Sequence, residues 1–126
     1  MSQNRPFRIF VVDDEAIIGI TLSKILGNSG YDARYFTDPV QALEEARKQK
    51  PDLLLSDVMM PKLSGIELAI AVREASPESE VLLLSGQSGT VDLMETARQR
   101  GHEFTLMHKP VHPTELLAHI GSLAGR

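Results

Sequence analysis

The chain has 126 residues, of which 42% are hydrophobic and 24% charged, and we expect residues 1–126 to form a single globular domain. The net charge of −4 argues weakly against a nucleic-acid surface, and the lack of cysteine excludes a disulfide framework, a thiolate nucleophile and a zinc knuckle. No apolar run approaches the roughly 18 residues of a membrane helix, and the polar start of the chain shows no signal peptide. We therefore expect a cytoplasmic protein with neither a nucleic acid nor a membrane as its direct partner.

Five short apolar runs alternate with five stretches of helical character. The predicted strands are residues 8–12, 31–36, 53–57, 80–85 and 104–108. The first helical stripe runs from Ile18 to Leu26, and Asp38 and the capping box formed by Ser64 and Glu67 mark two further helix starts. This alternation predicts a doubly wound, flavodoxin-like α/β fold, in which five helices cover a five-stranded parallel sheet of order 2-1-3-4-5.

The most informative stretch is the third strand, in which leucines 53–55 and Ser56 lead directly to Asp57. A continuous apolar run is typical of a strand that is buried on both faces of a parallel sheet. Such a strand would carry Asp57 to its carboxyl end, where open α/β sheets bind their ligands. We therefore expect Asp57 either to hold a ligand or to act as a nucleophile.

Polar side chains follow the ends of the other strands as well. Asp13 and Asp14 follow the first strand, Ser85 ends the fourth and Lys109 follows the fifth. In the predicted strand order these groups converge with Asp57, and three crowded carboxylates repel one another unless a cation lies between them. Mg²⁺ suits such oxygen ligands. Together with one lysine and one hydroxyl, the set predicts a phosphoryl site at which Asp57 forms an aspartyl-phosphate.

At these positions the sequence resembles the receiver domains of two-component response regulators, the CheY-like family. The resemblance covers nearly the whole chain. The residues that carry it are Asp13-Asp14, Asp57 with Met60-Pro61 and Gly65, Ser85-Gly86, and Lys109-Pro110. It implies a phosphoacceptor that receives a phosphoryl group from a sensor histidine kinase or phosphotransfer protein and signals to a downstream output protein or domain. No turnover of a separate substrate is expected.

The resemblance also implies roles for individual residues. Asp57 would accept the phosphoryl group and share a Mg²⁺ ion with Asp14, which would bind it directly, and with Asp13, which would act largely through water. The backbone carbonyl of Met59 would be a further metal ligand. No other cofactor is implied. Beside the site, Met59 and Gln87 are expected to tune the access of water.

The switch that the resemblance implies involves the other side of the site. Lys109 would pair with the phosphoryl oxygens, Ser85 would donate a hydrogen bond to one of them, and the Lys109-Pro110 peptide bond is expected to be cis. Receivers usually carry Tyr or Phe three residues before the lysine, whereas this chain has Leu106. We therefore expect a switch that is confined mainly to the loop after Ser85 and the first turns of the next helix.

Three other readings stay open. A phosphatase of the haloacid dehalogenase type also forms an aspartyl-phosphate, but it needs an aspartate two residues after the nucleophile, where this chain has Met59. A flavin mononucleotide binder would need a Ser/Thr/Gly-rich phosphate loop after the first strand. This chain has Asp13-Asp14-Glu15 there, and these acidic residues would repel a phosphate. An inert pseudo-receiver that acts only as a docking module is the third, and Leu106 is the residue that favours it.

Overall fold

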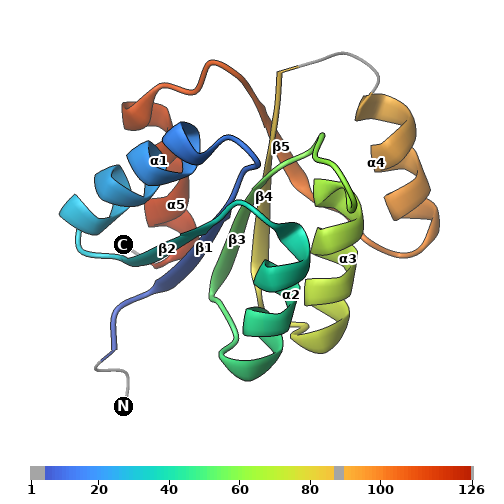
Figure 1. Cartoon of the computed structure of the whole chain (residues 1–126), viewed down its shortest axis with the longest axis horizontal. Helices are drawn as coiled ribbons and strands as arrows, with labels where there is room; N and C mark the ends of the chain where they lie inside the picture. Colours follow the sequence, from blue (N-terminus) through green and yellow to red (C-terminus); the bar gives the residue numbers. More distant parts are fainter. Residues whose placement is uncertain (1–4, 87–89, 126) are drawn as a thin grey trace.

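The computed structural model describes residues 5–86 and 90–125 and shows a parallel sheet covered by helices on both faces (Figure 1). The strands are β1 (Arg8–Val12), β2 (Asp32–Phe36), β3 (Leu53–Asp57), β4 (Glu80–Ser85) and β5 (Thr105–His108). The helices are α1 (Ala16–Asn28), α2 (Pro39–Lys48), α3 (Gly65–Ala75), α4 (Thr90–Gln99) and α5 (Pro113–Leu123). The strand order is β2-β1-β3-β4-β5, so the predicted fold class and topology are confirmed.

Two strands begin one residue later than the sequence predicts. Tyr31 was expected in the second strand, but its N–H donates to the carbonyl of Leu26 at 3.2 Å and so belongs to the turn that ends α1. Gly30, with a φ of 95°, provides the left-handed conformation that this turn requires. The fifth strand begins at Thr105 instead of Phe104.

Alternate residues of the strands enter two separate cores. On one face, Phe10 and Leu54 pack beneath α2, α3 and α4, whereas on the other Ile9 and Leu53 pack beneath α1 and α5. Leucines 53–55 are fully buried, and burial of each such side chain stabilises the fold by about 1.5–3 kcal/mol. Burial on both faces explains why β3 is continuously apolar and why its position is fixed.

Side-chain capping marks the starts of α2 and α3. The Asp38 side chain accepts a hydrogen bond from the Val40 N–H at the start of α2. At the start of α3, Ser64 and Glu67 exchange hydrogen bonds of 3.1 Å in the predicted capping box. Among the residues that the structure describes, no helix is both long and apolar enough to cross a membrane.

Candidate functional site

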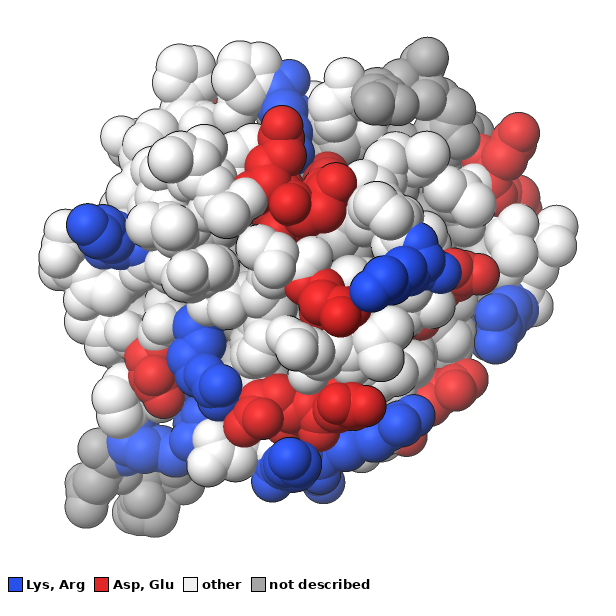
Figure 2. Space-filling model, in the orientation of Figure 1, with Lys and Arg blue, Asp and Glu red and all other residues white. Residues whose placement is uncertain are grey.

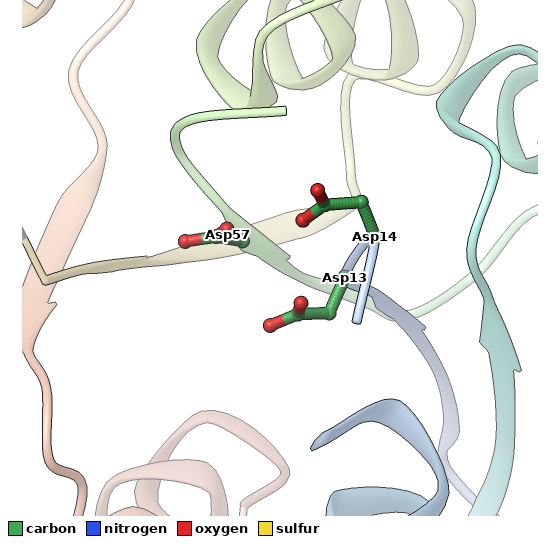
Figure 3. A group of neighbouring side chains, drawn as sticks. All are labelled: Asp13, Asp14 and Asp57. Atoms are coloured by element: carbon green, nitrogen blue, oxygen red, sulfur yellow. The ribbon is translucent and has the colours of Figure 1, made fainter. Parts of the chain in front are cut away.

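Three carboxylates meet at the carboxyl edge of the sheet. Asp13 and Asp14 follow β1, and Asp57 is the last residue of β3, which pairs with β1. One oxygen from each carboxylate lies within 4.8 Å of the others (Figure 3). Asp13 is 1% exposed, Asp57 is partly buried and Asp14 is exposed. The exposure of the three carboxylates therefore increases from Asp13 in the core, through Asp57, to Asp14 at the surface.

Lys109 places its charge between the two inner carboxylates. Its Nζ atom lies 3.3 Å from Asp13 Oδ2 and 3.2 Å from Asp57 Oδ1. The second carboxylate oxygen of Asp13 accepts the Glu15 N–H at 2.9 Å, so both oxygens of this buried group are paired. In the space-filling view, acidic side chains gather in a hollow with a basic side chain beside them (Figure 2).

The pKa values at the site follow from this packing. Burial raises the pKa of Asp57, Lys109 only partly offsets that effect, and Asp13 and Asp14 add to it. Burial alone would lower the pKa of Lys109, but Asp13 and Asp57 outweigh it, and the net pKa of the lysine is raised. The lysine therefore stays charged. Burial destabilises the ionised form of Asp57, and a further cation nearby would reduce that effect.

An open cleft of about 320 Å³ gives access to these groups. It is lined by Asp14, Glu15, Asp57, Met59, Gly86 and Lys109. Oxygen ligands at one side of such a cleft match the preference of Mg²⁺, which binds a few carboxylates and keeps several waters. The donor chemistry therefore fits the metal that the sequence implies. Glu15 and Gly86 were not predicted as part of the site, although each directly follows a predicted site residue.

Met59 reaches the cleft because of the loop between β3 and α3. The N–H of Val58 donates to the Leu84 carbonyl at 3.0 Å, and the N–H of Gly65 donates to the Val58 carbonyl at 2.8 Å. These bonds close the base of the loop and leave Met59, which is 47% exposed, at its outer part. The structure thus brings Met59 together with the acidic cluster.

Ser85 and Leu106 lie deeper in the sheet. Ser85 is 2% exposed at the end of β4, and its carbonyl accepts the Lys109 N–H at 2.8 Å. Leu106 packs against the core beneath α3 and α4, and Phe104, which precedes β5, packs against the same core, so the two side chains lie on the same face of the sheet. The Lys109-Pro110 peptide bond is cis, as predicted.

Phe104 is held by its neighbours near the C-terminal end of α3. The guanidinium of Arg73 lies 5.4 Å from the centre of its ring, and the His102 ring stacks on it at 5.8 Å. The predicted role of Gln87 and the predicted mobile loop concern residues 87–89, which lie outside the described residues.

The comparisons with known proteins agree with this geometry. Residues 9–121 match the response regulator receiver domain family. The chain is 33% identical over 113 residues to the DNA-binding response regulator MtrA of Mycobacterium tuberculosis, a match that covers 90% of this chain and 48% of MtrA. A response regulator receiver domain protein from Clostridium thermocellum superposes with a TM-score of 0.82 at 27% identity, with 94% of each chain covered.

A further solved structure, the BeF3-activated receiver domain of DrrB, has a TM-score of 0.81 at 27% identity and covers 96% of this chain and 99% of its own. Fold and site together define a receiver of two-component signalling. The chain belongs to the response regulator receiver domain family, as its CheY-like motifs predicted. Such domains interact with histidine kinases and are generally signalling modules rather than turnover enzymes. The chain spans about half the length of the curated relatives it matches.

Proposed function

We propose that this receiver is a phosphoacceptor that takes a phosphoryl group onto Asp57 in the presence of Mg²⁺. The observation that carries the proposal is the position of Lys109, whose ammonium lies 3.2 Å from the Asp57 carboxylate and 3.3 Å from that of Asp13. A fixed cation beside a carboxylate that faces an open cleft is the arrangement that stabilises an incoming phosphoryl group.

The proposed reaction is a transfer between two nucleophiles. A carboxylate oxygen of Asp57 attacks the phosphorus of a phosphohistidine, the phosphorus–nitrogen bond breaks, and the imidazole nitrogen keeps the electron pair and takes up a proton. Lys109 pairs with an oxygen of the transferred group. Asp13, Asp14, Asp57 and the Met59 carbonyl would hold the Mg²⁺, which would neutralise charge on the phosphoryl oxygens. Asp14, the exposed member, would bind it directly, and Asp13, whose oxygens are already paired, largely through water.

The same proposal includes a switch. Ser85 would donate its hydroxyl to the phosphoryl group, which would draw the following loop inward and shift the start of α4. Leu106 is aliphatic and already packs against the core, so we expect little change there. The signal would pass to a downstream protein or output domain, and the phosphoryl donor would be a sensor histidine kinase or a phosphotransfer protein. We place these events in the cytoplasm and treat residues 1–126 as one domain.

The two rivals that share this pocket make different predictions. A haloacid dehalogenase-type phosphatase would need a general acid where Met59 stands, and an inert docking module would take no phosphoryl group. Incubation with acetyl phosphate and Mg²⁺, followed by intact-mass analysis and peptide mapping, separates the phosphoacceptor from the inert docking module. We expect one phosphoryl group on Asp57, none without Mg²⁺ and none on Asp57→Asn. Stable label on Ser85 or His108 in that variant would contradict the assignment.

A further inference from the structure

Lys62 has a backbone conformation that is rare for a residue with a side chain. Its φ is 73°, and the N–H of Leu63 donates to the carbonyl of Pro61 at 2.8 Å. A hydrogen bond between residues i and i+2, with a positive φ at the residue between them, defines one of the two kinds of γ-turn. This kind is strained and rarer than the inverse γ-turn. Residues held in such conformations cluster at functional sites, because the surrounding structure must enforce them. Lys62 lies five residues after Asp57, in the loop that carries Met59.

The side chain of Lys62 connects this loop to the start of α2. Its Nζ atom lies 3.5 Å from Asp38 Oδ2, at the N-cap of α2, and Asp38 Oδ1 accepts the Val40 N–H at 2.9 Å. Asp38 follows β2 and Lys62 follows β3, while β1 lies between these two strands. The ion pair therefore spans the end of β1, close to Asp14, the exposed member of the acidic cluster.

A small cavity lies between the ion pair and Asp14, one of the proposed metal ligands. It has a volume of about 100 Å³ and is lined by Asp14, Thr37, Asp38, Pro39, Pro61 and Lys62. The hydrogen bonds of Val58 and Gly65 fix the base of the loop, and residues 59–64, which include Lys62, form its outer part. The contact between Lys62 and Asp38 thus ties the outer part of the loop to α2.

We propose that Lys62 is a positioning residue for metal binding, which acts by holding the outer loop, and with it the Met59 carbonyl, in place before the ion arrives. The inference rests on the proposed function, because it takes Met59 as a metal ligand. A ligand that is already ordered loses less conformational entropy when the ion binds, so binding is tighter. Lys62 itself touches neither the ion nor the phosphoryl group in this proposal.

The sign of the effect distinguishes positioning from simple electrostatics. Lys62 is a cation near a cluster of carboxylates, so removing its charge should by itself make Mg²⁺ bind more tightly. Loss of positioning should make Mg²⁺ bind more weakly. Lys62→Met keeps a Cβ at the strained position and removes both the charge and the ion pair with Asp38, so its effect on affinity shows which influence is larger.

The test is titration of Mg²⁺ into the purified chain, followed by amide NMR and calorimetry. We expect Lys62→Met to raise the Kd by roughly threefold, because a single exposed ion pair couples weakly. Asp38→Asn should do the same while keeping the helix cap, since Asn caps as well as Asp. The double variant should bind no more weakly than either single variant, and Lys62→Arg should bind like the wild type. Lys48→Met, the same charge change in the last turn of α2, is the control.

Each outcome has one meaning. Unchanged or tighter Mg²⁺ binding by Lys62→Met would overturn the positioning role, as would additive losses in the double variant. Lys62→Gly separates fold from function, because glycine adopts this φ without strain but cannot form the pair. We expect it to fold at least as stably as the wild type and still to bind Mg²⁺ more weakly. If the wild type bound no Mg²⁺, the proposed function itself would fail, which is a separate result.

Discussion

Gly65 lies so close to Asp57 that a Cβ added to the glycine would be 2.0 Å from the Asp57 carbonyl oxygen. The same Cβ would be 3.0 Å from the Ser56 hydroxyl oxygen. The first residue of α3 is therefore packed directly on the backbone of the proposed phosphoacceptor. Glycine is required here for close approach, and its φ is not the reason.

We predict that Gly65→Ala lowers the free energy of unfolding by about 1–3 kcal/mol, the usual effect of overpacking, because backbone must move to admit the methyl group. Urea denaturation measures the change. Gly121→Ala is the matched control, since a Cβ at that position in α5 meets nothing within 4 Å. That change should stabilise the chain by about 0.5–1 kcal/mol. Equal effects of the two substitutions would show that the contact with Asp57 is not restrictive.

The ionisation of Asp57 should destabilise the metal-free protein. Burial raises the pKa of this carboxyl above its ordinary value of 3.8, so the folded chain binds the proton more tightly than the unfolded chain does. Stability is therefore lost as the pH rises from below 3.8 through the folded-state pKa. Asp57→Asn does not ionise and escapes this loss.

The measurement is the free energy of unfolding of Asp57→Asn minus that of the wild type, taken in the presence of a chelator at several pH values. We expect the difference to increase with pH from about pH 3 and to level off once Asp57 is ionised. A constant difference over this range would mean that the Lys109 ion pair balances burial, and a decreasing one that it outweighs burial.

Asp14 should matter more for metal binding than its neighbour Glu15, although both side chains line the cleft. We expect Asp14→Ala to weaken Mg²⁺ binding by at least about tenfold, because it removes a proposed direct ligand, and Glu15→Ala to have a much smaller effect. Without metal, Asp14→Ala should raise the unfolding midpoint, since it relieves repulsion among three carboxylates. Identical midpoints for this variant and the wild type without metal would count against that repulsion.

Ser85 should couple phosphorylation to the movement of the following segment. We predict that Ser85→Ala still accepts a phosphoryl group on Asp57 but loses most of the change in amide NMR shifts over residues 86–95 when beryllofluoride is added. Leu106 should shift little in either protein. If the variant reproduces the full wild-type pattern over these residues, then the hydroxyl of Ser85 does not transmit the signal.

Much of this fold could be predicted from the sequence because each strand carries a local signal. The leucines that lead to Asp57 indicate a doubly buried strand, and the polar residues after the other strands gain meaning once the strand order places them at one edge. The capping residues Asp38 and Ser64 likewise act within one turn. Local interactions of this kind leave direct traces in the sequence.

The features that the sequence did not reveal depend on contacts between distant segments. The left-handed conformation of Lys62 has no signal, because lysine does not favour positive φ and the turn is imposed by the loop around it. The overlap of a Gly65 Cβ with Asp57 arises only when α3 docks on the end of β3. The sequence predicts a strand residue at Tyr31, but its N–H closes the end of α1.

The strand order also separates the charges of the site along the sequence. Asp13 and Asp14 follow β1 and Asp57 ends β3, and these two strands pair with each other in the first half of the chain. The cation that lies between two of them follows β5, the last strand of this sheet along the sequence. Until that strand joins β4, the repulsion among the three acids is not opposed by Lys109. β5 thus both completes the sheet and carries, just after its end, the cation that offsets the negative charge gathered at the ends of β1 and β3.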